Sequence, residues 1–250
     1  MSRQKLGQHF LIKGSILERI AAAACAEREP LVVEIGPGRG ALTEKLLKRA
    51  ERVVAIELDA DLVEHLRRKF VNERRLEVIH ADALDVDLSR WGAAPIAGNL
   101  PYYVATPIIE RTVRRRASRA VFLIQKEVAE RLAAAPGNRE YGFLSVATQL
   151  FANARVLFDV KPAAFRPPPK VDSAVVRLDP RAGAPSEDEA AGFLRFVGLC
   201  FHQKRKTIRN NLADAYGRAL VDMLPESGLR AEQIGIVRLI AMYERVIATS

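Results

Sequence analysis

Alternation of short apolar runs with helical patterns between residues 31 and 124 is the feature that most restricts the fold. An apolar run at 31–35 is followed by a glycine-rich loop at 36–40 and then by a helical pattern that begins near Leu42. Further apolar runs at 53–56, 76–80, 95–98 and 120–124 are predicted to be strands. Strands that alternate with helices build a parallel sheet with helices on both faces. We therefore expect an α/β fold with a Rossmann-like sheet.

The pattern changes in the later part of the chain. Two predicted strands, at 155–160 and 173–178, have no helix-length segment between them, so an antiparallel pair at the sheet edge fits. Residues 179–189 are rich in proline and acids and read as a linker, and the pattern after them is helical. We expect an α/β domain at 1–178 and a small all-helical C-terminal domain at 179–250.

Two helix starts can be predicted from their residue types. Asp59 is a suitable N-cap for a helix that carries Leu62, Leu66 and Phe70 on one face. In Thr106-Pro107, the hydroxyl is predicted to cap a second helix, with proline at its first position.

The charge balance favours a polyanionic partner. Lys and Arg number 39 against 30 Asp and Glu, which gives a net charge of +9. Nucleic acid is the partner that such a surplus most often indicates, although an Arg- and Ala-rich coding bias would produce it too. Cys25 and Cys200 and the four histidines have no disulfide or metal-ligand spacing, and no apolar stretch is long enough for a membrane span. We expect a cytoplasmic protein without metal or membrane.

The loop Gly36-Pro37-Gly38-Arg39-Gly40 lies between a predicted strand and a predicted helix. Glycines at this place let the backbone turn sharply and approach a ligand closely. Gly36, Gly38 and Ala41 also satisfy the dinucleotide fingerprint G-x-G-x-x-A. The loop therefore indicates a ligand that contains adenosine, and it fits NAD as well as S-adenosylmethionine.

Carboxylates follow the next two predicted strands. Glu57 closes the second strand, where it could accept hydrogen bonds from both ribose hydroxyls of either cofactor. Asp82 follows the third strand, where it could accept a hydrogen bond from an adenine amine. Each acid alone could equally be a helix cap or a surface group. Together with the glycine loop they mark the carboxyl ends of three successive strands, where open α/β sheets bind ligands.

The tetrapeptide Asn99-Leu100-Pro101-Tyr102 follows the fourth predicted strand. The adenine amine is a poor nucleophile, and acceptors on its two N–H groups could localise its lone pair. The Asn99 oxygen and the Leu100 carbonyl, held extended by Pro101, could supply these acceptors. Tyr102 offers a face to an unstacked base. The alternative is a structural one, a proline turn with a buried tyrosine. The position of the tetrapeptide after the fourth strand, next to the three predicted ligand features, favours methyl transfer. Methyl transfer depends mainly on positioning the reacting groups.

Several motifs along the chain resemble those of the bacterial small-subunit (16S) rRNA adenine N6-dimethyltransferases, the KsgA/RsmA family. The motifs are residues 6–11, 33–38, 54–57, 81–83, 98–103, 165–173 and 204–212. The resemblance covers almost the whole chain. It implies a class I methyltransferase sheet and S-adenosylmethionine as cofactor. The implied reaction is N6,N6-dimethylation of two adjacent adenosines near the 3′ end of 16S rRNA, within the small ribosomal subunit or its precursor.

The resemblance also implies roles for individual residues. Residues 99–102 match the catalytic loop, and Phe165 matches an aromatic that would cover the other face of the target base. The implied cofactor contacts are His9, Leu11, Gly36, Glu57, Asp82 and Asn99. Gly38 of the glycine loop is expected to contact the cofactor as well. The family often has Asn where this chain has His9, and an imidazole could hydrogen-bond the cofactor in its place. We expect a monomer with a further role in small-subunit biogenesis.

Basic side chains that could meet phosphate occur in several places, although any one run is more often only a solvated surface. The run that the resemblance includes is Lys204, Arg205, Lys206 and Arg209, and it is the best candidate for RNA binding. The other basic positions are Arg3, Lys5, Arg114, Arg115, Arg116, Arg119, Lys161, Arg166 and Lys170.

Three other functions compete with this interpretation. A 23S rRNA adenine methyltransferase of the macrolide-resistance type shares the glycine loop and the tetrapeptide, but residues 204–212 favour the small-subunit family. An NAD-dependent dehydrogenase would leave Asn99 and the basic surplus unexplained. A ribosome assembly factor with little catalysis would not need Asn99, Asp82 and Glu57.

Overall fold

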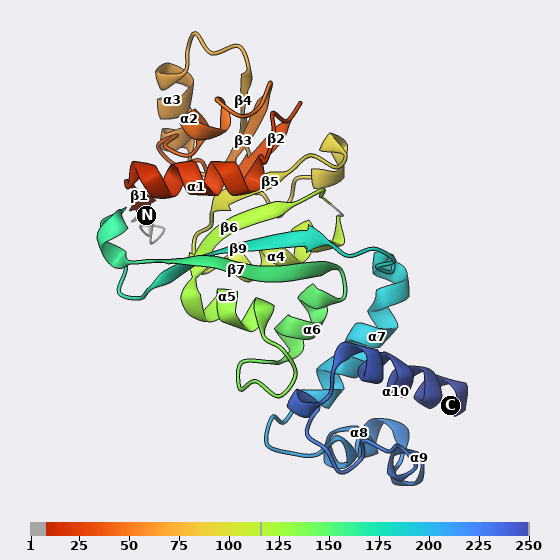
Figure 1. Ribbon diagram of the computed structural model, residues 1–250. Helices are drawn as coiled ribbons and strands as arrows, with labels where there is room; N and C mark the ends of the chain where they lie inside the picture. The colour runs from red at the N-terminus through yellow and green to blue at the C-terminus, as the bar shows by residue number, and fades with distance from the viewer. Residues whose placement is uncertain (1–8, 116, 250) are drawn as a thin grey trace, which may run out of the picture. The chain divides into compact units, whose positions relative to one another are not determined.

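A seven-stranded sheet forms the centre of the first part of the molecule in the computed structural model, which describes residues 9–115 and 117–249 (Figure 1). Arg3, Lys5, Arg116 and the motif positions Leu6, Gly7 and Gln8 lie outside the described residues. The strands are β2 (Val32–Ile35), β3 (Val53–Glu57), β4 (Leu76–His80), β5 (Ile96–Asn99), β6 (Ala120–Gln125), β7 (Ala152–Val160) and β9 (Ser173–Pro180).

The sheet has the mixed topology expected from the sequence. Its strand order is β4-β3-β2-β5-β6-β9-β7. The first five strands in this order pair in parallel, and β9 pairs antiparallel with β6 from Ala120↔Leu178 to Gln125↔Ser173. The prediction of an α/β sheet with an antiparallel edge is therefore confirmed.

In the middle of the sheet, both faces are buried because helices cover them. Val121 and Leu123 belong to a core that includes Ile20 of α1 (Gly14–Ala24) and Leu46 of α2 (Thr43–Leu46). Phe122 and Ile124, which alternate with Val121 and Leu123, point to the opposite face and are also fully buried. The apolar run of β6 is therefore continuous from Ala120 to Ile124, as is typical of a strand buried on both faces.

A second, two-stranded ladder joins distant parts of the chain. In it β1 (Phe10–Leu11) pairs antiparallel with β8 (Phe165–Arg166), in the register Phe10↔Arg166 and Leu11↔Phe165. The backbone N–H of Ile12 extends this contact by donating to the Ala164 oxygen over 2.9 Å. Strands this short carry no periodicity, so the sequence did not predict them.

The remaining helices start where local chemistry allows. They are α3 (Ala60–Lys69), α4 (Ala105–Arg114), α5 (Lys126–Ala133), α6 (Phe143–Gln149), α7 (Glu187–Cys200), α8 (Ile208–Tyr216), α9 (Arg218–Asp222) and α10 (Ile236–Thr249), with 3-10 turns at Leu88–Trp91, Pro162–Ala164 and Ala231–Gln233. The predicted cap Asp59 is confirmed, because its side chain accepts from the N–H groups of Asp61 and Leu62. The predicted start at Thr106 is wrong.

Helix α4 begins at Ala105 because the chain is already turning before it. Val104 donates from its N–H to the Pro101 oxygen, and Val104 precedes the helix without any side-chain cap. Thr106 and Pro107 therefore fall inside the first turn. Proline is tolerated there because the first N–H groups of a helix have no partner within the helix.

The linker is shorter than the 179–189 expected from composition. β9 continues to Pro180, and α7 already begins at Glu187. The reason is a capping box: Ser186 accepts from the N–H of Glu189, whose carboxylate accepts from the N–H of Ser186. Acidic residues that suggested a linker are thus the first turn of a helix, where they suit the helix dipole.

The chain divides into two compact units. The first contains the residues up to Ala129 and Asn153–Pro180, and the second contains Glu130–Ala152 and the residues from Arg181 onwards. The helical unit thus includes a segment that the expected range 179–250 left out. Hydrogen bonds hold this segment within the unit, from Gly137 N to the Glu232 oxygen and from Arg181 N to the Phe151 oxygen. In the part of the chain that the structure describes, no helix is long and apolar enough to cross a membrane.

Candidate functional site

A cavity of about 500 Å³ lies in the α/β unit, at the carboxyl ends of β2, β3 and β5. Its position follows from the strand order, because the chain leaves β2 toward β3 on one side and later places β5 on the other side. Such a reversal opens a crevice at the carboxyl ends of the strands. The lining includes His9, Phe10, Leu11, Ile12, Leu17, Glu34, Gly36, Pro37, Gly38, Arg39, Ala41, Leu42, Glu57, Leu62, Asn99, Leu100, Pro101, Tyr102 and Arg166.

The glycine loop forms one wall of this cavity. Gly36 and Gly38 both have positive φ, 69° and 57°, a backbone region that residues with a side chain rarely adopt. A Cβ on Gly38 would come within 3.1 Å of the Phe10 ring, and one on Gly36 would lie 3.5 Å from the Asn99 carbonyl oxygen. The absence of side chains lets the loop stay close to these neighbours and leaves the cavity open.

Glu57 is buried at the end of β3 and faces the glycine loop. Its Oε2 accepts from the N–H of Gly38 and its Oε1 from the N–H of Asp59, each over 3.0 Å. Burial raises the pKa of Glu57, and the two backbone donors oppose that rise. Each carboxylate oxygen keeps a further acceptor position. The group is therefore held in place and can accept hydrogen bonds from a pair of hydroxyls in the cavity.

Asn99 is oriented by the first described residue of the chain. Its Nδ2 donates to the His9 carbonyl oxygen over 3.0 Å, so its Oδ1 remains as an acceptor. The ring of His9 is fixed in turn, since its Nδ1 lies 2.8 Å from the Pro167 carbonyl oxygen. The ends of β5, β1 and β8 thus support one another around the cavity.

Tyr102 stands beside His9 at the cavity wall, with ring centroids 5.8 Å apart. Its hydroxyl is 2.7 Å from the Ser173 hydroxyl of β9, which fixes the direction of the ring. Leu100 is buried and donates from its N–H to the Leu123 oxygen, so the tetrapeptide is anchored to β6. All four residues of the tetrapeptide line the cavity.

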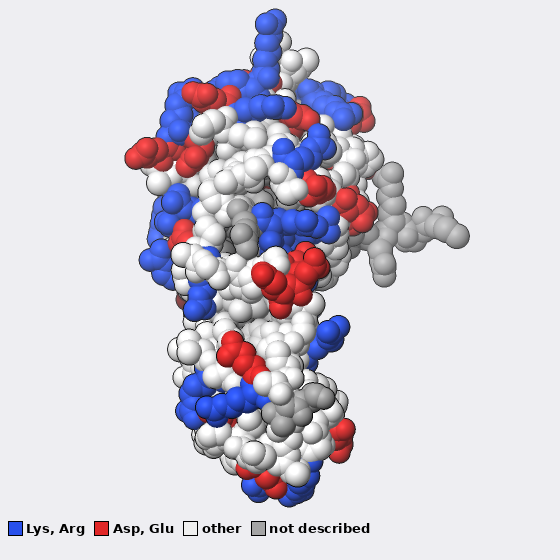
Figure 2. Space-filling model, turned by 90° about the vertical axis from the view of Figure 1, so that its right-hand side faces the viewer, with Lys and Arg blue, Asp and Glu red and all other residues white. Residues whose placement is uncertain are grey.

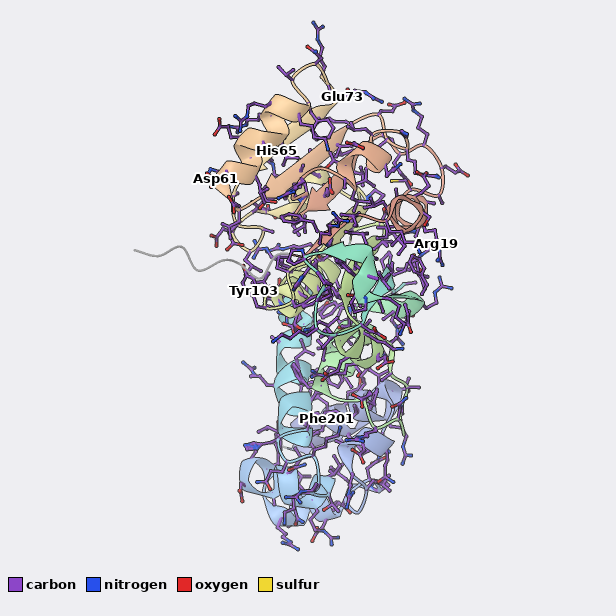
Figure 3. All side chains as sticks on the ribbon, turned by 90° about the vertical axis from the view of Figure 1, so that its left-hand side faces the viewer. Arg19, Asp61, His65, Glu73, Tyr103 and Phe201 are labelled. Carbon is purple, nitrogen blue, oxygen red and sulfur yellow. The ribbon has the colours of Figure 1, made fainter. Side chains whose placement is uncertain are left out.

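Most of the predicted site residues therefore lie around one cavity. These are His9, Leu11, Gly36, Gly38, Glu57, Asn99, Leu100, Pro101 and Tyr102. Asp82 follows β4 and accepts from the N–H of Leu84, and it does not belong to the cavity lining. The neighbour of Tyr102, Tyr103, is largely exposed and is labelled in Figure 3. Negative charge on Asp82 and Glu57 contributes to a raised pKa of its hydroxyl, although partial burial contributes more.

Phe165 is placed differently from the expectation. It is only 2% exposed and belongs to the hydrophobic core with Leu11, Val160 and Ala164. Its partner in the β1–β8 ladder is Leu11. The ring is thus a core side chain and does not line the cavity, and its contact with the target base stays a prediction. The neighbouring Arg166, whose side chain is exposed, lines the cavity instead.

Sequence reasoning missed Glu34 and Arg39 as parts of the site, and it named Arg166 only among the basic side chains that could meet phosphate. Arg39 follows Gly38 and places its guanidinium carbon 4.8 Å from the centre of the Phe10 ring. Glu34 is 1% exposed and accepts from the Thr43 hydroxyl over 2.6 Å. An acid inside the otherwise apolar run 31–35 was a visible sign, because buried acids need a specific reason. Arg166 had no comparable sign apart from its place in the proline-rich motif.

The basic run predicted to bind RNA lies in the helical unit, with Lys204, Arg205 and Lys206 between α7 and α8 and Arg209 in the first turn of α8. Lys204, Arg205 and Lys206 are exposed, and Lys204 donates to the Arg139 carbonyl oxygen over 2.6 Å. Arg209 differs from them because it is half-buried and pairs with Asp222 at 2.6 Å. On the face drawn in Figure 2, positive side chains occur on both units and are interspersed with acids.

The weaker candidates at 114–119 are partly engaged within the fold. Arg114 pairs with Glu110, and Arg119 pairs with Asp179. Across residues 9–115 and 117–249, no group of three or more His, Cys, Asp or Glu is arranged to hold a metal ion.

Comparison with known proteins gives consistent matches. The family model described as ribosomal RNA adenine dimethylase matches residues 1–234. A Chlorobium luteolum protein named ribosomal RNA small subunit methyltransferase A is 41% identical, over 98% of this chain and 89% of its own length. A dimethyladenosine transferase structure from Plasmodium falciparum superposes with a TM-score of 0.80 at 26% identity, covering 95% and 98% of the two chains. The structure of the 23S rRNA methyltransferase ErmE superposes with a TM-score of 0.74 at 27% identity, covering 95% of this chain and 99% of that chain.

Proposed function

This chain belongs to the ribosomal RNA adenine dimethylase family, and from that premise we propose that it dimethylates the N6 amines of two adjacent adenosines near the 3′ end of 16S rRNA. The curated relatives carry the name of small-subunit methyltransferases, which favours 16S over 23S rRNA. The observation that carries the proposal is a single cavity that joins Glu57, an acceptor for hydroxyls, to Asn99 and Tyr102.

S-adenosylmethionine is the cofactor in this proposal, and it supplies a methyl group on a positively charged sulfonium. The residues present fit it. Gly36 and Gly38 present no side chain to the cavity, and Glu57 can accept the two ribose hydroxyls while Gly38 and Asp59 hold it. Leu11 and Leu42 offer apolar surface, and both are buried against the cavity. Asp82 is proposed to accept from the adenine amine of the cofactor.

Asn99 is proposed to act on the amine that receives the methyl group. Because its Nδ2 is held by the His9 oxygen, its Oδ1 is the end that can accept a hydrogen from the amine. The Leu100 carbonyl is the second proposed acceptor, and the ring of Tyr102 is the surface on which the base stacks. Two acceptors leave the nitrogen lone pair directed away from the ring plane, and the rate gain then comes from holding the reacting atoms in position.

The helical unit is proposed to dock on the small subunit or its precursor through Lys204, Arg205 and Lys206, while the α/β unit receives the base. Exposed cations that bind phosphate supply affinity that is independent of sequence. Arg209 contributes less in this scheme because Asp222 already neutralises it. We propose that the protein acts as a monomer.

The decisive experiment is incubation of the purified protein with radiolabelled S-adenosylmethionine and small subunits from a strain that lacks this modification. Subunits already modified and large subunits are the controls. The expected result is label in the unmodified small subunits alone, recovered as dimethyladenosine. Label in the large subunit would move the assignment to 23S rRNA, the substrate type named for ErmE. No label in any sample would contradict the proposed catalysis and leave a role in assembly.

A further inference from the structure

Glu34 is a buried acid inside the cavity wall that the proposed reaction does not use. It lies in the middle of β2, with Ala55 and Ala97 beside it in the neighbouring strands. The side chain is 1% exposed and belongs to the cavity lining. Its one recorded hydrogen bond comes from the Thr43 hydroxyl of α2, at 2.6 Å. A hydroxyl donor stabilises a carboxylate much less than a positive partner does.

The charged groups around Glu34 do not supply that positive partner. The nearby charges that act on Glu34 are the carboxylate of Glu57, at the end of β3, and the ammonium of Lys69, in α3, whose effect is the smaller. The ammonium of Lys69 is engaged elsewhere, 2.7 Å from Glu44 and 2.9 Å from the Arg39 carbonyl oxygen. Within the described ranges, no Lys or Arg forms an ion pair with Glu34. Burial is the main cause that raises the pKa of Glu34 to about 8, and the negative charge of Glu57 adds to it. The hydrogen bond from Thr43 lowers this pKa but does not offset the rise.

The proposed cofactor and its product, which would occupy the cavity that Glu34 lines, differ by one charge. S-adenosylmethionine carries a sulfonium cation, whereas S-adenosylhomocysteine carries a neutral thioether and is otherwise the same. A cation held in a cavity with little water interacts strongly with an acid in its wall. It favours the ionised form of that acid, and a neutral thioether does not.

We propose that Glu34 senses this charge: it carries a proton in the free enzyme and in the product complex, and it releases that proton to solvent when S-adenosylmethionine binds. The inference rests on the cofactor named under the proposed function. The charge balances at each stage, because a cation enters as a proton leaves. After the methyl group and its charge have gone to the amine, the amine loses a proton and the carboxylate takes one up. Glu34 thus favours the substrate form of the cofactor over the spent form.

Calorimetric titration in two buffers of different ionisation enthalpy counts the protons released on binding. At pH 7 we expect roughly 0.4 to 0.8 proton released per S-adenosylmethionine and none per S-adenosylhomocysteine, by linkage. Between pH 6.5 and 7.5 the affinity for S-adenosylmethionine should rise roughly threefold or more relative to the product. Both readouts use the wild-type protein, so they do not depend on the folding of a variant.

Two variants assign the proton to its residue. Glu34→Gln should abolish the release while still binding both ligands, since glutamine can accept from Thr43 but cannot titrate. The matched control is Glu57→Gln, which should weaken both ligands equally and keep part of the release, because it removes a charge that raises the pKa of Glu34 but leaves the burial of Glu34 unchanged. Complete loss of the release in Glu57→Gln, or its persistence in Glu34→Gln, would assign the proton elsewhere and overturn the inference. Binding of S-adenosylmethionine without proton release would also overturn it and leave the cofactor standing, whereas binding of neither ligand would reject the cofactor too.

Discussion

Asn99 joins a structural hydrogen bond and a proposed chemical role in one amide, and one substitution tests both. In Asn99→Ala the cavity loses the proposed acceptor, so the single-turnover methylation rate should fall roughly 100-fold or more, as when a fixed catalytic hydrogen-bond group is removed. The lost bond to the His9 oxygen should cost only about 1 kcal/mol of stability. Rates are to be measured on unmodified subunits at saturating cofactor.

Asn72→Ala, at an exposed position between α3 and β4, is the control for Asn99→Ala. It should keep the wild-type rate. A rate for Asn99→Ala within a few-fold of the wild type would contradict the role assigned to the amide.

Phe165 is a core residue, so its truncation should act on stability. Phe165→Ala is expected to lower the free energy of unfolding by about 3–5 kcal/mol, because it removes a ring that is 2% exposed. Phe143→Ala, at a position 37% exposed, should cost much less. Denaturant titration of both variants measures the difference. A loss of methylation by Phe165→Ala without loss of stability would instead support contact with the base.

Glu34 should also give the folded protein a distinctive pH dependence. Its pKa is near the ordinary value of 4.5 in the unfolded chain and is raised to about 8 in the fold, so the protonated form is the one that the fold favours. This stability is complete below pH 4.5 and is lost as the pH rises to 8. Glu34→Gln should therefore gain thermal stability relative to wild type between pH 5 and 8.5. A difference in melting temperature that does not change with pH would contradict the raised pKa.

Residues that follow strands were predictable as site residues, and residues that arrive from outside the sheet were not. Gly36, Glu57 and Asn99 all follow strands whose carboxyl ends meet at one edge, so their order along the chain was enough. Arg166 reaches the cavity through pairing of β8 with β1, a contact that no local pattern encodes. For the same reason, the burial of Phe165 could not be deduced from its motif.

At the level of elements, strong periodicity and side-chain caps were reliable guides, and composition was a poor one. The strands of the sheet and the Asp59 cap were predictable because each has a local physical cause. Thr106-Pro107 has the residue types of a helix start, but the preceding turn at Pro101 began the helix earlier. Acidic residues after Pro180 resembled a linker, although Ser186 and Glu189 close a capping box there.

The contact between β2 and β5 depends on a residue without a side chain. A Cβ on Gly98 would lie 2.4 Å from the Ile35 carbonyl oxygen of the neighbouring strand, and backbone cannot move aside as a flexible side chain can. Gly98→Ala should therefore destabilise the protein by about 1–3 kcal/mol or more and disturb the cavity beside it.

Gly14→Ala is the matched control for Gly98→Ala, since nothing lies within 4 Å of its added Cβ. It should be neutral or slightly stabilising. Thermal melts of the two variants give the comparison, and equal melting temperatures would show that β2 and β5 can separate at no cost.

For the whole molecule, the division into two units separates chemistry from docking in the proposed scheme. Charge reversal at Lys204 and Arg205 should weaken binding to small subunits by about tenfold or more at low salt and reduce the salt dependence, since about two phosphate contacts are lost. Cofactor affinity should stay unchanged, because the cavity is formed by the other unit.

Arg218→Glu is the control for this charge reversal, because Arg218 is an exposed arginine of the same unit that lies outside the run 204–209. Filter binding over a series of salt concentrations measures both variants. Unchanged subunit affinity after reversal of Lys204 and Arg205 would show that this run is only a solvated surface.

The ladder between β1 and β8 also determines how much of the chain must be synthesised before the cavity is complete. His9 and Pro167, which meet beside the cavity, are 158 residues apart in the chain. Contacts of such sequence separation close late, since the intervening chain must be made and ordered first. A nascent chain that has not yet emerged past Arg166 lacks one wall of the cavity, however well the first five strands have formed. Competence for methylation should thus arrive late in synthesis on the ribosome, the class of particle that the finished protein is proposed to modify.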